Sequence, residues 1–374
     1  MNSSAPDPFD PTEHVANPTK TAIDRTENVA TTPASIAPTT ASASGFPIAE
    51  IFFGPDGLRA GWGILLFVAL CVLLFFCMNL LQTLLFPHSF GAVAFNTPRG
   101  LLTSEGRALI VATLASLAMA KIERRSIAAY GFAHNRGLRN FANGIGCGLA
   151  LLSLLVFSLR ALGLLVFDAR LLRGVDAMRY GAVWLLGFLL VGLLEEMLFR
   201  GYLQFTLARG INGLYRWLSA APRATGLHAA VPNAVGFWAA ALLISFGFGF
   251  SHHTNAGESP IGLLAAALIG VVFCLSLWRT GSLWWAIGFH AAWDWAQSFL
   301  YGVADSGTTV VGHLFATHPV GRTILSGGLT GPEGSIYILP IIALTVAAIF
   351  FTLPRSPRDE PAAAVPRDPL GGLD

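Results

Sequence analysis

Charged side chains are scarce in this sequence. Only 12% of its 374 residues are Asp, Glu, Lys or Arg, whereas a soluble domain has about 25%. The formal net charge is only +2, and no stretch interleaves clustered basic residues with aromatic ones. The composition therefore argues against a soluble globular protein, and we expect no nucleic-acid partner.

Several familiar catalytic and cofactor-binding motifs are also missing. The sequence has no G-x-S-x-G nucleophile elbow, no H-E-x-x-H zinc motif, no Walker loop and no Rossmann glycine pattern. Its four cysteines all lie inside apolar runs and lack the spacing of metal ligands: Cys71, Cys77, Cys147 and Cys274. We expect these cysteines to be small buried apolar side chains.

Long apolar runs dominate what is present, because 54% of the residues are hydrophobic. A helix of about 20 apolar residues is long enough to cross the hydrocarbon core of a bilayer. The sequence therefore predicts an all-α polytopic membrane bundle with about eight transmembrane helices. The expected spans are 61–86, 107–120, 141–167, 180–204, 233–250, 261–278, 282–301 and 334–353.

The two ends of the chain differ from this apolar centre. Residues 1–45 are rich in Ala, Thr, Ser and Pro, and residues 354–374 are rich in Pro and charge. Neither segment can bury enough apolar surface to fold, so we expect a disordered arm and a disordered tail around a bundle at 46–353. No internal repeat is visible, which weighs against the commoner transporter architectures.

The basic residues predict an orientation in the membrane. If the N-terminus is cytoplasmic and eight spans follow, most of the 23 Lys and Arg residues fall on the cytoplasmic side. We therefore expect both termini in the cytoplasm, in a bacterial cytoplasmic membrane, with Glu195 and Glu196 toward the cytoplasmic end of the fourth span. His252 then falls near the outer end of the fifth span, at the opposite side of the membrane from Glu195. The two residues can share one site only if the fifth span is short and deep, or if the predicted spans overlook a re-entrant segment.

Two features of the third expected span concern packing. Gly144 and Gly148 are spaced to let another helix approach closely. Arg160 lies in the second half of the same span, where it either extends toward the membrane surface or pairs inside the bundle. The sequence leaves these two alternatives for Arg160 open.

The fourth expected span carries Glu195, Glu196 and Arg200 in an otherwise apolar helix. A charge at the bilayer centre costs at least ~2.5–3.5 kcal/mol on insertion scales, so these groups should face protein or a wet cavity. Glu196 and Arg200 are four residues apart and share a helical face, whereas Glu195 points about 100° away. We expect structural pairing for Glu196 with Arg200 and a free carboxylate at Glu195.

Histidines provide the other titratable groups near apolar spans. His252 follows F-G-F-S at the end of the fifth span, and its neighbour His253 has the weaker claim to a role because it faces elsewhere. His290 and Asp294 in the seventh span are four residues apart, so the carboxylate can contact and orient the imidazole.

These residues are chemically sufficient for peptide hydrolysis. A Glu and a His can together hold and deprotonate a water molecule, and a second His can donate to the oxyanion that forms. Glu195, His252 and His290 could instead bind zinc and leave one position open for water. The same groups could also form a proton relay in a transporter, or polar contacts that only hold helices together.

The motifs E-E-M-L-F-R-G, F-G-F-S-H and H-A-A-W-D resemble, in this order, those of the CAAX-protease and bacteriocin-processing family. Its members are intramembrane endopeptidases, also called the Abi or type II CAAX prenyl endopeptidase-like family. The similar region runs from about residue 121 to about 301. It includes the softer signature I-E-R-R-S-I-A-A-Y-G-F at 122–132.

The resemblance implies eight helices around a hydrophilic chamber that is open to one leaflet and to the cytoplasm. It implies that Glu195 and His252 activate water, that His290 and the residue four positions later stabilise the oxyanion, and that Glu196 and Arg200 support the site. The expected substrate is a membrane-associated protein or peptide, and no cofactor is required.

Asp294 departs from the family pattern, in which Asn is usual at this position. An ionised Asp can only accept hydrogen bonds, so Asp294 either orients His290, or is protonated, or leaves the oxyanion to His290 alone. The rival functions are a proton-coupled transporter that uses the same side chains and a non-catalytic immunity or scaffold protein.

Overall fold

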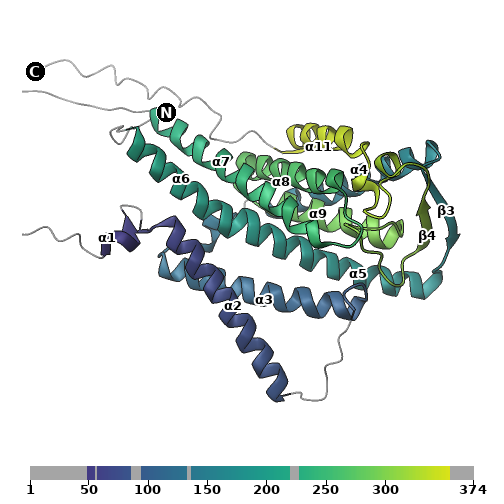
Figure 1. Ribbon diagram of the computed structural model, residues 1–374, viewed down its shortest axis with the longest axis horizontal. Helices are drawn as coiled ribbons and strands as arrows, with labels where there is room; N and C mark the ends of the chain where they lie inside the picture. Colours follow the sequence, from purple (N-terminus) through teal and green to yellow (C-terminus); the bar gives the residue numbers. More distant parts are fainter. Residues whose placement is uncertain (1–48, 55–56, 86–93, 133–135, 220–226, 354–374) are drawn as a thin grey trace, which may run out of the picture. The chain divides into compact units, whose positions relative to one another are not determined.

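The computed structural model describes residues 49–54, 57–85, 94–132, 136–219 and 227–353. The expected arm at 1–45 and tail at 354–374 lie outside these residues. Helices form most of the described chain (Figure 1). The N-terminal part comprises α1 (Ala49–Phe52), β1 (Phe53–Gly54), β2 (Gly57–Leu58), α2 (Ala60–Leu85), α3 (Pro98–Ile122), α4 (Gly137–Ala161) and β3 (Leu165–Arg170). There follow α5 (Gly174–Glu195), α6 (Gln204–Leu218), α7 (Leu227–Ser251), α8 (Pro260–Thr280), α9 (Trp284–Trp295), β4 (Phe315–Pro319), α10 (Thr323–Ser326) and α11 (Ile338–Thr352).

Six helices in the described part of the chain are long and apolar enough to cross a membrane. They are Ala60–Leu85, Pro98–Ile122, Gly137–Ala161, Gly174–Leu218, Asn233–Thr254 and Pro260–Thr280. The seventh and eighth expected spans correspond to shorter helices, namely α9 with a π-helical continuation at Ala296–Leu300, and the 15-residue α11. The predicted all-α membrane bundle is confirmed.

The third expected span differs from the sequence prediction at its C-terminal end. The third expected span was to reach residue 167, but α4 ends at Ala161 and β3 follows. Gly163 takes a positive φ of +71° between them, a conformation that glycine adopts without strain. The β-branched and aromatic residues of β3 then pair antiparallel with β4, a partner about 150 residues away that local pattern could not reveal.

The helix that contains the fourth expected span is longer than predicted. The chain continues from α5 through a π-helical segment at Glu196–Leu203 into α6, giving 45 helical residues in a row. Arg209 and Arg216, which follow the expected span at 180–204, therefore lie on α6, while Arg223 lies outside the described residues. A helix rises 1.5 Å per residue, so this run is much longer than the hydrocarbon core is thick.

The close approach predicted at Gly144 and Gly148 is confirmed, and the partner is α9. A Cβ at Gly144 would lie 2.2 Å from the carbonyl oxygen of Trp285, and one at Gly148 would lie 2.5 Å from that of Phe289. Around this crossing lies the largest apolar core, which includes Leu152, Leu155, Phe273, Trp285 and Phe289. The crossing fixes the position of α9, the helix that carries His290.

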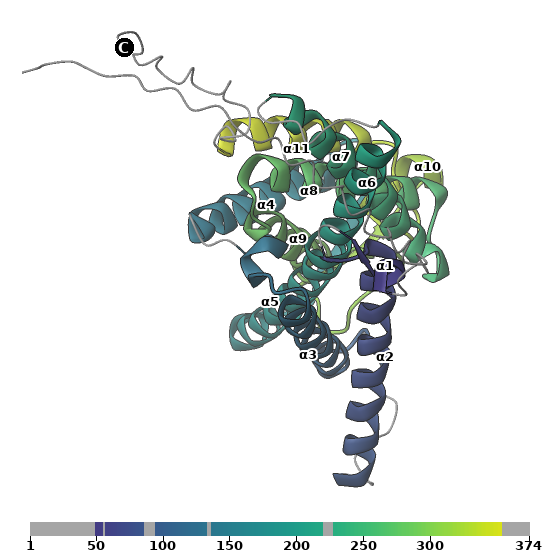
Figure 2. The same ribbon diagram turned by 90° about the vertical axis from the view of Figure 1, so that its left-hand side faces the viewer.

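Arg160 and the cysteines can now be placed. Arg160 is exposed in the last turn of α4, with its guanidinium 4.9 Å from the ring centre of Phe167, so it extends toward the surface. Cys274 is buried as predicted, but Cys77 is exposed and that prediction was wrong. Cys77 lies on α2, of which only Gly63 and Phe67 are buried, and both views show α2 diverging from the other helices (Figures 1 and 2).

The helices run between two ends of the bundle that are distinguished by their connections. At the end we call the ribbon end, β3 pairs with β4, Val311 donates to the carbonyl of Asn96, and Thr330 donates to that of Gly257. These contacts join the connections at 94–97, 162–173, 252–259 and 301–337. At the opposite end, called the basic end here, Phe132 pairs with Ser282 and Arg279 donates to the carbonyl of Leu353.

The crossing of α4 and α9 can be tested with a single methyl group. Gly148→Ala should lower the free energy of unfolding by about 1–3 kcal/mol, because the new Cβ meets a backbone carbonyl that cannot move aside. Gly146→Ala is the matched control, since nothing lies within 4 Å of its Cβ, and it should be neutral or slightly stabilising. Unfolding in detergent micelles measures both variants, and equal stability of the two would refute this packing.

Candidate active site

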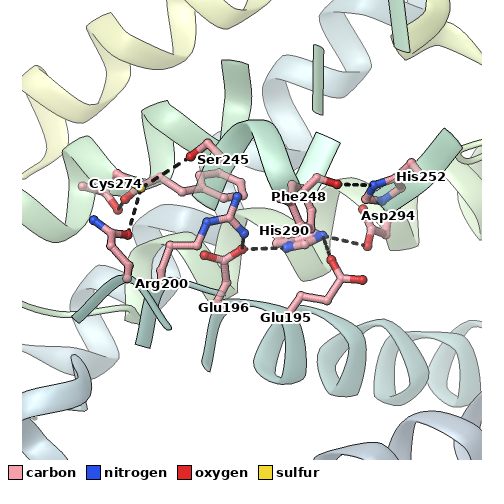
Figure 3. A network of polar contacts seen from close by, with 12 residues as sticks. Glu195, Glu196, Arg200, Ser245, Phe248, His252, Cys274, His290 and Asp294 are labelled. Carbon is pink, nitrogen blue, oxygen red and sulfur yellow. Dashed lines mark hydrogen bonds and ion pairs between the residues drawn. The ribbon is translucent and has the colours of Figure 1, made fainter. Parts of the chain in front are cut away.

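A cavity of about 420 Å³ extends into the bundle from its ribbon end. Four of the six side chains singled out from the sequence line it: Glu195, His252, His290 and Asp294. The other two, Glu196 and Arg200, are 0% and 1% exposed and lie behind His290 (Figure 3). The structure thus brings the three sequence motifs together from α5, α7 and α9.

Glu196 and Arg200 form a buried ion pair, with 2.9 Å between Arg200 Nη1 and Glu196 Oε1. The guanidinium also lies 4.3 Å from the ring centre of Phe248 and 5.6 Å from that of Phe273. The faces of these rings attract a cation, and they contribute to holding a charge that has no access to water. The expected pairing of Glu196 with Arg200 is present.

His290 is held by a carboxylate on another helix. Its Nδ1 lies 3.0 Å from Glu196 Oε1, the same oxygen that accepts from Arg200. Because an ionised carboxylate can only accept, Nδ1 carries the proton and donates. His290 Nε2 then faces the cavity, 3.5 Å from Glu195 Oε2 and 3.5 Å from Asp294 Oδ2. Asp294 does contact His290 as expected, but Glu196 is the closer carboxylate, so the orientation of the ring depends mainly on Glu196.

His252 has a defined tautomer of its own. It is the first residue after α7, in a short turn at His252–Thr254, and its Nδ1 donates to the carbonyl of Phe248 at 2.9 Å. In the neutral ring, Nε2 is then the nitrogen left to accept a proton. His253 stacks its exposed ring on Phe250 and stays outside the cavity lining, in agreement with its weaker claim.

The sequence predicts Glu195 and His252 toward opposite sides of the membrane, and the structure explains how both can line one cavity. Because the fourth helix runs from Gly174 to Leu218, Glu195 lies near its middle and not near one end. The cavity reaches from Glu195 to the ribbon end, where His252 follows α7, so both side chains line it without a re-entrant segment.

A polar cluster behind the ion pair was missed in the sequence. Cys274 donates to Gln204 Oε1 at 3.0 Å and lies 3.7 Å from Ser245 Oγ. All three side chains are almost fully buried. Spacing offered no signal for this contact, because the three residues lie on three different helices.

Further acids near the site were also missed. Glu105 lies two turns inside α3, which begins earlier than predicted, and it interacts electrostatically with Glu195. At the mouth of the cavity, Asp305 accepts from Ser298 Oγ at 3.0 Å, and Glu333 accepts from Ser306 Oγ at 2.8 Å. Burial, followed by the charges of Asp294 and Glu333, raises the pKa of Asp305 well above its ordinary value.

The zinc alternative finds no preformed site in the described part of the chain. No group of three or more His, Cys, Asp and Glu side chains there has a geometry that could hold a metal ion. Glu195, His252 and His290 all line the cavity, but they do not form such a group.

The buried ion pair generates a prediction about stability. Arg200→Met should cost about 3–5 kcal/mol, because it removes the main counter-charge of the buried Glu196 carboxylate. The double variant Glu196→Gln/Arg200→Met should recover part of that loss, since no buried charge then lacks its partner. Chemical unfolding in detergent measures both variants.

The half-exposed pair of His318 with Asp168 provides the control. Asp168→Ala should change the free energy of unfolding by less than about 1 kcal/mol, since water screens this pair. A similar cost for Asp168→Ala and Arg200→Met would contradict the assignment of Arg200 as a buried counter-charge.

Comparison with known proteins adds independent information. Residues 178–296 match the family model described as type II CAAX prenyl endopeptidase Rce1-like. This range contains all three motifs, although it begins after the softer signature at 122–132. Searches of curated proteins and of solved structures returned no match. The resemblance seen in the sequence is confirmed over residues 178–296, which match the model of an Rce1-like type II CAAX prenyl endopeptidase domain.

Proposed function

We propose that this protein is an intramembrane endopeptidase that cleaves a membrane-associated protein or peptide with a water molecule activated by Glu195 and His252. The observation that carries the proposal is the convergence of Glu195, His252 and His290 on one cavity inside an apolar bundle. A second observation supports it, namely the family match over the same helices.

Glu195 and His252 are the candidates for activating water. Glu195 is part-exposed in the cavity, with 26% of its side chain accessible to solvent. Arg200 forms its ion pair with Glu196 and not with Glu195. His252 offers Nε2 as an acceptor, because its Nδ1 donates to the backbone. A water held between a carboxylate and an imidazole nitrogen can lose a proton to either as its oxygen attacks the amide carbon. The proton then passes to the leaving amine as the C–N bond breaks, which balances the reaction.

His290 is the candidate oxyanion donor. With Nδ1 donating to Glu196, the ring needs a second proton on Nε2 to donate into the cavity. Carboxylates of Glu195, Glu196 and Asp294 surround that imidazolium and balance its charge. As the amide carbon becomes tetrahedral, Nε2–H stabilises the negative oxygen. Asp294, if ionised, acts by holding Nε2 in place, since it has no proton to donate.

Glu196 and Arg200 are positioning residues in this scheme. Both lie outside the cavity lining, so neither meets the substrate. Arg200 fixes Glu196, and Glu196 fixes the ring of His290. The π-helical turn that begins at Glu196 widens the helix at this point, and such turns recur at functional sites.

The proposed roles predict a loss of hydrolysis. In proteoliposomes supplied with internally quenched peptides that contain an apolar segment, Glu195→Gln and His252→Ala should each lower the rate by about 10²–10⁴-fold, because each removes one group that accepts the proton of water. His253→Ala is the matched control, since its ring is exposed outside the cavity, and it should keep the wild-type rate.

Full activity in both site variants would show that these roles are wrong. If the wild-type protein cleaves no peptide but supports flux that depends on a pH gradient, the transporter alternative replaces the peptidase.

Metal dependence is tested separately. We propose a glutamate-based reaction without metal, so activity should survive prolonged chelation and elemental analysis should find no stoichiometric metal. Loss of activity under chelation, with recovery on adding zinc, would instead favour Glu195, His252 and His290 as zinc ligands.

A further inference from the structure

The mouth of the cavity lies at the ribbon end of the bundle. Its lining continues from Glu195 and His290 to residues in three connections of that end: Asn96, Asn255, Ser306, Thr308 and Glu333. Among the residues that the structure describes, none in the connection at 281–283 or in the one between α3 and α4, both at the basic end, lines the cavity. Substrate therefore enters from the ribbon end or from the leaflet beside it.

The basic residues gather at the other end. Helices α3, α6 and α8 finish there with Lys121, Arg216 and Arg279 in their last turns. Other described basic residues of the basic end are Arg59, Arg124, Arg125, Arg136, Arg139 and Arg209. Arg223 belongs to the connection between α6 and α7, and Arg355, Arg358 and Arg367 follow Leu353 in the sequence.

Fewer basic residues lie toward the ribbon end, and acids accompany them. The basic ones are Arg99, Arg107, Arg160, Arg170, Arg173, Arg179 and Arg322, and the acids include Asp168, Glu258, Asp305 and Glu333. Lys and Arg near the ends of spans are retained on the cytoplasmic side of a membrane, whereas Asp and Glu have little influence. The basic end is therefore the cytoplasmic end.

We infer that the chamber opens on the non-cytoplasmic side of the membrane, and that its substrates are segments of membrane-anchored or exported proteins already translocated to that side. The substrate class rests on the proposed protease function, whereas the orientation does not. Two expectations from the sequence, cytoplasmic termini and a chamber open to the cytoplasm, are incompatible in this fold, because the mouth and Leu353 lie at opposite ends. His252 follows α7 at the ribbon end, so in this orientation it also lies toward the non-cytoplasmic side.

Cysteine labelling tests the orientation without any assay of activity. Thr309→Cys places a thiol at an exposed site of the ribbon end, and Ser219→Cys places one at an exposed site of the basic end. Cys71, Cys77 and Cys147 are first changed to Ala, and the fully buried Cys274 is kept. The probe is a membrane-impermeant maleimide applied to intact bacterial spheroplasts that express the full chain.

The inference predicts that Thr309→Cys is labelled in intact spheroplasts, whereas Ser219→Cys is labelled only after permeabilisation. Labelling of both variants in detergent controls for thiol reactivity, and the background without added cysteines should stay unlabelled. Labelling of Ser219→Cys in intact spheroplasts, or protection of Thr309→Cys until permeabilisation, overturns the inference.

A second measurement separates orientation from chemistry. Internally quenched peptide added outside right-side-out vesicles should be cleaved at the same rate before and after the vesicles are permeabilised. Cleavage that appears only after permeabilisation contradicts the orientation but leaves the protease intact. Absence of cleavage by the detergent-solubilised protein as well contradicts the proposed function, while the labelling result for orientation stands.

Discussion

One carboxylate oxygen, Glu196 Oε1, links the ion pair in the π-helical segment after α5 to the imidazole of His290 on α9. It accepts from Arg200 at 2.9 Å and from His290 at 3.0 Å, and the side chain has no exposure to solvent. A buried carboxylate is costly unless its charge is balanced, so this oxygen requires both partners. Once both are in place, the ring of His290 has one orientation, and its free nitrogen faces the cavity beside Glu195 and Asp294.

The surrounding bundle is built to keep that arrangement fixed. The glycines of α4 let α9 approach to backbone contact, which sets the depth of His290. The rings of Phe248 and Phe273 enclose Arg200, and the carbonyl of Phe248 also fixes His252. One aromatic residue thus connects the positioning pair to the candidate base. Such preorganisation matters for hydrolysis, because groups held in place before the reaction need no reorganisation as charge develops.

Much of the site could be predicted from the sequence because charge is so rare in it. An acid, a histidine or an arginine inside an apolar run is expensive, so Glu195, Glu196, Arg200, His290 and Asp294 were conspicuous without any structure. Their i, i+4 spacings also predicted which neighbours on one helix touch. The spans themselves followed from length and hydropathy, apart from shifts at their ends.

What sequence could not supply were contacts between distant segments. The bond from His290 to Glu196 joins residues 94 positions apart, and β3 pairs with a strand that lies in what reads as a glycine-rich loop. The π-helical turn at Glu196 has no signature in composition. The direction in which the cavity opens also depends on which connections meet in space, and this is why the expectation of a cytoplasmic mouth came from resemblance and not from the residues.

The central claim is that Glu195 is held at the position where a carboxylate can deprotonate water. Shortening this side chain by one methylene keeps its charge and moves the carboxylate away. The account predicts that Glu195→Asp, with unchanged thermal stability, hydrolyses an internally quenched peptide about 10²-fold more slowly than the wild-type protein, since misplacement by about 1 Å has effects of that size. A rate equal to that of the wild-type protein would contradict it.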